Sequence, residues 1–151
     1  MLGKVQEHVI KIFFMKIIHF ITHPLFLIAY FLLLVISGES LSNFYCFYIV
    51  LALLHGGIHS MLAVLGIGIL VFSYAKYKNN FNYKIEPILN IGGALLLLSS
   101  LFSFFYTDVD RYNYGTFYET VPLTILIVFI LVELTFLIKN FMKIGFKMFA
   151  V

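Results

Sequence analysis

The sequence predicts an all-α integral membrane protein: a four-helix bundle forming one membrane domain over residues 1–151, with an interfacial helix at its N-terminal end. The first observation is composition, because 62% of the 151 residues are hydrophobic and only 11% are charged, whereas soluble domains are far more polar. The second is the length of the apolar runs, which exceeds what strands or half-buried helices need. At ~20 residues per crossing, the expected spans are residues 17–37, 45–74, 87–106 and 120–137.

The third observation is the distribution of basic residues over the segments that connect these spans. The first loop has no lysine or arginine, and the third has only Arg111, beside Asp108 and Asp110. The lysines all lie before the first span, in the second loop or after the last span: Lys4, Lys11, Lys16, Lys76, Lys78, Lys84, Lys139, Lys143 and Lys147. The positive-inside rule puts that side in the cytoplasm. We therefore expect a bacterial inner-membrane protein with both termini cytoplasmic.

Residues 2–16 are expected to form an amphipathic helix. Apolar residues recur on one face at helical spacing and polar ones lie on another: Leu2, Val5, Val9 and Phe13 against Lys4, His8 and Lys11. Such a helix lies in the membrane interface, with its lysines toward anionic lipid headgroups. One alternative is a simple extension of the first span into the cytoplasm. The other is a cleaved signal peptide, whose charged and apolar regions would both be too long here, with no A-x-A-like cleavage site.

The first span contains His19, His23 and Pro24. A proline inside a helix removes a backbone hydrogen bond and usually kinks the helix. A helix that restarted at Pro24 would leave only residues 25–37, which is short for a crossing. The sequence therefore favours one kinked helix that includes both histidines.

The second span, residues 45–74, is expected to be the central helix that contacts its neighbours. His55 and His59 lie near its middle and are four residues apart, so they share a helix face. A stripe of small residues at the same spacing favours close contact between helices: Ala52, Gly56 and Ser60.

The third span begins at Pro87, a residue suited to a first helical turn. Its small residues predict a face that packs on the second span: Gly92, Ser99 and Ser103, with Gly93 and Ser100 beside them. In the fourth span, Thr120 can cap the helix and Pro122 falls in its first turn.

Glu133 is the one acidic residue inside any expected span. Ionisable groups at this depth face the protein interior and generally have a partner. Glu133 and His23 each lie about six residues from the cytoplasmic edge, or roughly 9–10 Å into the membrane. We therefore expect these two side chains to be close in space, within one subunit or between subunits.

The outer loop, residues 107–119, is rich in aromatic residues. An interfacial aromatic belt is the favoured interpretation, and a docking surface for an exterior protein is the alternative. Its two aspartates lack the remaining ligands of a calcium loop.

The sequence contains no G-x-S-x-G, H-E-x-x-H or phosphate-binding glycine motif, and the segments outside the spans are too short for a catalytic domain. The lysines are split among short segments, which excludes a nucleic-acid-binding domain, and no arginine-rich helix exists to sense voltage. The first hypothesis is a non-catalytic membrane subunit that forms a homo-oligomer or anchors a partner protein. Its docking surface would be cytoplasmic: Lys76, Lys78, Lys84, Lys139 and Lys143.

Two alternatives use the polar groups of the spans, which we take as one candidate cluster of His23, His55, His59 and Glu133. Imidazoles ligate haem iron, zinc and copper. A b-type haem or a divalent metal could therefore be held by members of one set: His19, His23, His55 and His59. In a small transporter or channel, His59 and Glu133 would instead handle protons or ions. Without any such role, the histidines would form hydrogen bonds within the bundle or line a small wet cavity.

No residue motif singles out one family of four-span membrane proteins. Phe, Ile, Lys, Asn and Tyr are abundant, and their A/T-rich codons are typical of a low-GC genome or a mobile genetic island. Some membrane proteins encoded on such islands serve in defence or immunity, so a membrane component of a defence or immunity system is a further hypothesis.

Overall fold

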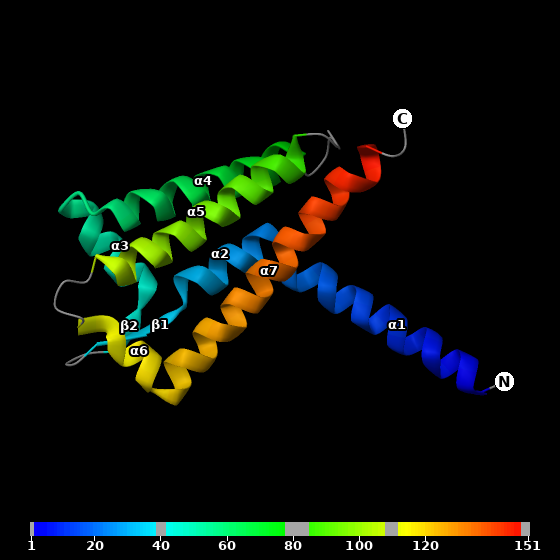
Figure 1. Cartoon of the computed structure of the whole chain (residues 1–151). Coiled ribbons are helices and arrows are strands. Elements are labelled where there is room, and N and C mark those ends of the chain that lie inside the picture. The colour runs from blue at the N-terminus through cyan, green and yellow to red at the C-terminus, as the bar shows by residue number, and fades with distance from the viewer. Residues whose placement is uncertain (1, 39–41, 78–84, 108–111, 149–151) are drawn as a thin grey trace.

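The computed structural model describes residues 2–38, 42–77, 85–107 and 112–148, and these residues are mostly helical (Figure 1). Three helices are long and apolar enough to cross a membrane: α4 (Ile58–Tyr77), α5 (Glu86–Tyr106) and α7 (Thr120–Met148). The prediction of a largely helical membrane protein is therefore confirmed. A fourth crossing exists only if the bent pair α1 and α2 is counted as one span, so the four-helix bundle and the orientation of the termini stay predictions.

The expected first span is broken. Helix α1 (Leu2–Ile21) ends before His23, and α2 (Pro24–Leu32) starts at a bend of 61°. His23 caps α2 with an extended backbone, and its Nδ1 accepts a hydrogen bond from the Leu25 N–H at 3.3 Å. Pro24 takes the first helical position, where a missing N–H leaves no bond unmade. The prediction of one kinked helix over residues 17–37 is wrong, because the His–Pro pair forms a helix start.

A short antiparallel hairpin follows α2. Strand β1 (Val35–Ser37) pairs with β2 (Ser42–Phe44), so the last residues of the expected first span are extended. The 3-10 helix η1 (Tyr112–Tyr114) and α6 (Gly115–Tyr118) lie against this hairpin (Figure 1). The Ser37 N–H donates to Thr116 Oγ1 at 2.9 Å, and Ser37 Oγ donates to Glu119 Oε1 at 2.5 Å. These bonds satisfy backbone and side-chain groups that an isolated hairpin in an apolar setting would leave unpaired.

The expected second span is also broken. Helix α3 (Tyr45–Leu54) ends at a turn, and α4 begins at Ile58. Gly56 lies in this turn with φ +72°, a left-handed conformation that glycine adopts without a steric penalty. The prediction of one continuous helix over residues 45–74 is therefore wrong. Figure 1 shows α3 linking the hairpin to the start of α4, and with ten residues α3 is too short to cross a bilayer.

Helices α4 and α5 form the closest helix pair and run side by side (Figure 1). They meet at Gly66 and Gly93. A Cβ added to Gly66 would lie 2.9 Å from the Gly93 carbonyl oxygen, and one added to Gly93 would lie 2.7 Å from Leu70 Cγ. The absence of side chains at these two positions lets the backbones approach, as small residues commonly do in membrane proteins.

Helix α7 starts at Thr120 as the sequence predicts, but continues beyond residue 137 to Met148. Its buried stripe repeats at helical spacing and comprises Leu126, Phe129, Glu133, Phe136 and Asn140. The stripe faces α2 and α5, which α7 contacts. In Figure 1 α1 extends away from the other helices, and its side chains from Lys16 to Phe20 are exposed.

Candidate functional site

A polar pocket of about 230 Å³ lies where four parts of the chain meet. These are the break between α1 and α2, the last turns of α4, the first turns of α5 and the C-terminal part of α7. We call this cavity the lysine-end pocket. Its lining residues are His19, Thr22, His23, Pro24, Ser73, Tyr74, Tyr77, Glu86, Asn90, Lys139, Asn140 and Lys143.

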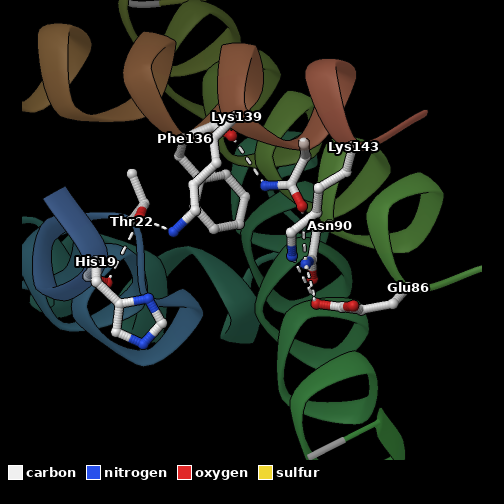
Figure 2. A network of polar contacts seen from close by, with 8 residues as sticks. His19, Thr22, Glu86, Asn90, Phe136, Lys139 and Lys143 are labelled. Atoms are coloured by element: carbon white, nitrogen blue, oxygen red, sulfur yellow. Dashed lines mark hydrogen bonds and ion pairs between the residues drawn. The ribbon is translucent and has the colours of Figure 1, made fainter. Parts of the chain in front are cut away.

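One set of bonds in this pocket joins α5 to α7 (Figure 2). Lys143 Nζ lies 3.2 Å from Glu86 Oε1, and Asn90 Nδ2 donates to Asn140 Oδ1 at 3.1 Å. Asn140 Nδ2 in turn donates to the Phe136 carbonyl at 2.8 Å. Both asparagines are nearly completely buried, so these bonds form in a weakly screened setting where polar groups need partners.

A second set of bonds ties α7 to the break between α1 and α2. Lys139 Nζ donates to Thr22 Oγ1 at 2.6 Å (Figure 2). Thr22 Oγ1 in turn donates to the Ile18 carbonyl at 2.5 Å. Within the described part of the chain, the one ion pair is that of Lys143 with Glu86. The ammonium of Lys139 therefore forms no direct ion pair there.

Two polar atoms of the lysine-end pocket are buried without a hydrogen-bond partner among the residues that the structure describes: Ser73 Oγ and Asn90 Oδ1. Ser73 is completely buried. Buried polar groups are nearly always paired, and each exception asks for an explanation. A polar ligand in the pocket would provide one.

Glu133 is the most unusual side chain of the core. It is completely buried, and neither carboxylate oxygen has a hydrogen-bond partner in the described ranges. It lies on the same stripe of α7 as Phe129 and Phe136. Asn140, in the pocket, is seven residues further along α7, which is about 10 Å. Phe136 therefore lies between Glu133 and the lysine-end pocket along the helix.

The structure does not bring His23 and Glu133 into a hydrogen bond. The His23 ring instead lies 5.0 Å from that of Tyr74. Glu133 accepts no hydrogen bond in the described part of the chain and does not line the pocket that contains His23. His23 and Glu133, which the sequence predicts at a similar membrane depth, thus lie in different surroundings, because the break at His23 turns its side chain toward the end of α4.

His55 and His59 do not share a helix face, because the turn at Gly56 separates them. His55 caps the end of α3, is exposed, and its Nδ1 lies 2.9 Å from the Leu51 carbonyl oxygen. His59 lies in the first turn of α4, with its ring 5.0 Å from Phe104. His59 Nε2 is buried without a partner among the described residues.

Beside His59 a small polar network joins α3, α4 and α5. The Tyr45 hydroxyl lies 2.9 Å from Ser100 Oγ, which donates to the His59 carbonyl at 2.7 Å. Tyr45 and Ser100 are completely buried. Nothing in the sequence places Tyr45 in the core, since its position among aromatic residues at a span end is typical of an interfacial anchor.

The two histidine pairs lie at opposite ends of α4. His23 contacts Tyr74, which is fifteen residues after His59 along this helix, so about 22 Å separates the two levels. A haem with one ligand from each pair is therefore not formed by this geometry. Among the described residues, no group of three or more His, Cys, Asp or Glu side chains could hold a metal ion.

The small residues predicted to pack between helices have other positions. Ala52 lies against Gly57, and Ser60 Oγ donates to the Gly57 carbonyl at 2.6 Å, so Ala52, Gly56 and Ser60 build the turn between α3 and α4. On α5, a Cβ on Gly92 would meet nothing within 4 Å, and Ser99 is exposed. Ser103 is half-buried. The contact face of α5 is rotated by one residue, to Gly93 and Ser100.

The lysines predicted as a docking surface divide into three groups. Lys76 is exposed, with its Nζ 5.2 Å from the centre of the Phe72 ring. Lys139 and Lys143 are half-buried in the lysine-end pocket. Lys78 and Lys84 lie outside the described residues, as do Asp108, Asp110 and Arg111 of the outer loop.

Sequence reasoning missed Thr22, Ser73, Glu86, Asn90 and Asn140 as residues of one site. A signal existed for the two asparagines, because Asn is rare in apolar spans and needs a partner there. Nothing in the sequence indicated that residues 50 and 117 positions apart would pair.

Comparisons of this chain with protein-family profiles, with curated proteins and with solved structures find no match. The function is therefore inferred from the chain's own residues.

Proposed function

We propose that this chain is a small, non-enzymatic membrane protein that takes up and releases a proton or a monovalent cation at Glu133, as a transporter or channel does. One observation carries the proposal: Glu133 is completely buried on a spanning helix, and both its oxygens lack a hydrogen-bond partner in the described ranges. Ionisable residues within membrane spans are expensive to keep and mark ion and proton pathways.

A charged carboxylate withdrawn from water carries a penalty on the order of several kcal/mol unless hydrogen bonds or an opposite charge offset it. Glu133 has neither among the described residues. A proton or a bound cation neutralises the carboxylate, so occupancy by either species stabilises this part of the core, and release of the species requires access to water.

Polar groups on both sides of Glu133 support such access. Toward the lysine end, Asn90 and Asn140 line a polar pocket, and the buried residues Phe136 and Leu137 lie between that pocket and Glu133 along α7. Toward the other end, Ser100 is ten residues beyond Asn90 on α5, about 15 Å along the axis, and bonds Tyr45. His59 Nε2 lies at this end as a further buried polar atom.

Proton flux into liposomes tests this function. Purified protein in vesicles with a pH-sensitive dye should acidify the lumen when a potassium diffusion potential is imposed, and Glu133→Gln should abolish the flux. Thr124→Val is the matched control on α7, because Thr124 is exposed and its hydroxyl donates to the Thr120 carbonyl of the same helix. Equal flux through wild type and Glu133→Gln, for protons and for Na⁺ or K⁺, would remove Glu133 from any transport role.

A second candidate function is a non-catalytic subunit that forms a homo-oligomer or holds a partner protein in a bacterial inner membrane, lysine end inward. The specific observation is the outward face of α5, where Gly92 has open space around it and Ser99 is exposed. Small residues on a lipid-facing surface allow a second helix to approach closely. Gly92→Leu should then dissociate the assembly measured by light scattering in mild detergent, whereas Leu95→Ile should not. A strictly monomeric wild-type protein that recovers no partner from membranes would contradict this function.

A further inference from the structure

The lysine-end pocket has the charge of a site for an anion. Among its lining residues the pocket has two lysines, Lys139 and Lys143, and one carboxylate, Glu86, which forms its ion pair with Lys143. The lining thus carries an excess of positive charge, and Lys139 donates to the Thr22 hydroxyl and not to a carboxylate. Lysine commonly binds phosphate, because its ammonium group is a compact point charge with several hydrogen-bond donors.

The pocket also has buried hydrogen-bonding groups of both kinds. Ser73 Oγ can donate to a phosphate oxygen, and it is completely buried without a partner in the described part of the chain. Asn90 Oδ1 is an acceptor that is likewise buried without a hydrogen-bond partner among the described residues. Glu86 adds carboxylate oxygens at the pocket wall. These acceptors suit hydroxyl groups carried next to the phosphate, so the group that fits best is a phosphate ester with free hydroxyls.

A second, apolar cavity adjoins this pocket. It has a volume of about 450 Å³ and is lined by Lys16, His19, Phe20, His23, Leu25 and Phe26. His19 and His23 line both cavities, so the two are neighbours at the break between α1 and α2. A polar pocket for a charged head beside an apolar cavity for a chain is the arrangement that an amphiphile needs.

The height of the pocket along the spans agrees with a lipid headgroup. Lys139 is nineteen residues after Thr120, the first residue of α7, which corresponds to about 29 Å of helix. This distance matches the ~30 Å hydrocarbon thickness of a bilayer. If Thr120 lies at one interface, Lys139 lies at the other, at the level of lipid phosphates.

We propose that the lysine-end pocket binds the phosphate of an anionic glycerophospholipid with a hydroxylated headgroup, such as phosphatidylglycerol, and that one acyl chain occupies the adjoining apolar cavity. Lys139 and Ser73 contact the phosphate, while Asn90 and Glu86 accept hydrogen bonds from headgroup hydroxyls (Figure 2 shows Lys139, Asn90 and Glu86 around the pocket). Glu133 does not line this pocket, so the lipid site and the ion-handling role depend on different key residues, although Asn90 belongs to both.

The test is native mass spectrometry of the delipidated full-length protein, titrated with phosphatidylglycerol or phosphatidylcholine of the same chain length. We expect one phosphatidylglycerol to bind well ahead of phosphatidylcholine. Lys139→Gln should weaken that first binding step about tenfold or more, as loss of a charge-assisted bond implies. Lys76→Gln is the matched control, because Lys76 is exposed and lies outside the pocket. Ser73→Ala, which removes a single buried oxygen, gives a second variant that should fold even if Lys139→Gln does not.

Three outcomes would overturn the proposal. Equal binding of the two lipids would show that the protein does not distinguish the headgroups by their charge. Equal weakening by Lys139→Gln and Lys76→Gln, with no effect of Ser73→Ala, would reduce the effect to general attraction between the protein and anionic lipid. Inorganic phosphate that competes fully with phosphatidylglycerol, and loses its own binding in Lys139→Gln, would show that the ligand is free phosphate and not lipid. Glu133→Gln should leave lipid binding unchanged, so this test and the flux measurement fail independently.

Discussion

Replacing Gly66 with alanine tests the packing of α4 on α5, the two helices that carry the buried polar residues Ser73, Asn90 and Ser100. A Cβ at this position would lie 2.9 Å from the Gly93 carbonyl oxygen, 2.9 Å from Leu97 Cδ2 and 3.2 Å from Leu96 Cβ. The backbone oxygen cannot move without shifting α5 itself. Forcing an additional methyl group into a packed core costs about 1–3 kcal/mol, so we expect Gly66→Ala to have an unfolding free energy lower by roughly that amount than a glycine-to-alanine control at an open position of the same helix.

Gly68→Ala is the matched control for this change. It lies two residues away on α4, and a Cβ there would meet nothing within 4 Å. Both substitutions gain the same helix propensity, up to about 1 kcal/mol, so their difference isolates the clash. Reversible unfolding in mixed micelles, followed by circular dichroism, gives both free energies. Equal stability of the two variants would mean that Gly66 and Gly93 are not in contact, and the arrangement of α4 and α5 described above would be incorrect.

Two further changes test other parts of the structure. Glu133→Leu replaces an uncompensated buried carboxylate with an apolar side chain of similar size. It should therefore raise the unfolding free energy by about 1–4 kcal/mol and eliminate ion flux. A destabilised variant would indicate that Glu133 has a structural partner. Gly56→Ala forces a residue with a Cβ into φ +72° and should lower the unfolding free energy by about 1–2 kcal/mol. Gly145→Ala, at an open position, is the control in the same unfolding assay. Equal stability of the two variants would mean that α3 and α4 are not joined by this turn.

The sequence predicted those helices whose signals are local. Pro87 near the start of α5 and Thr120 with Pro122 at the start of α7 are residues that favour helix starts whatever surrounds them. Hydropathy averaged over a span-length window also located α4 and α5. The same averaging concealed the turn at Gly56, because two glycines and a histidine hardly lower the mean of an otherwise apolar run.

The contact face of α5 could not be chosen from the sequence. Gly92 with Ser99 and Gly93 with Ser100 are two small-residue faces that differ by a single residue, or about 100° of helix rotation. Only packing against α4 selects between them, and Gly93 is chosen because Leu70 and Gly66 lie opposite it. The pocket was hidden for a related reason, since Thr22 and Lys139 are brought together by the bend after α1 and by the extension of α7 beyond the expected span.

The two helix breaks that were not predicted from the sequence, at His23 and at Gly56, also determine where the polar groups of this protein lie. Non-helical backbone at membrane depth is tolerated where it is buried in protein or lines a cavity. The break at His23 lies at the wall of the lysine-end pocket, where Thr22 meets Lys139. The break at Gly56 places His59 and Ser60 at the start of α4, beside the Tyr45–Ser100 network. In continuous helices these side chains would be spread at regular spacing along the helix axes. The interruptions instead collect them into one polar group at each end of the core, with Glu133 on the buried stripe between.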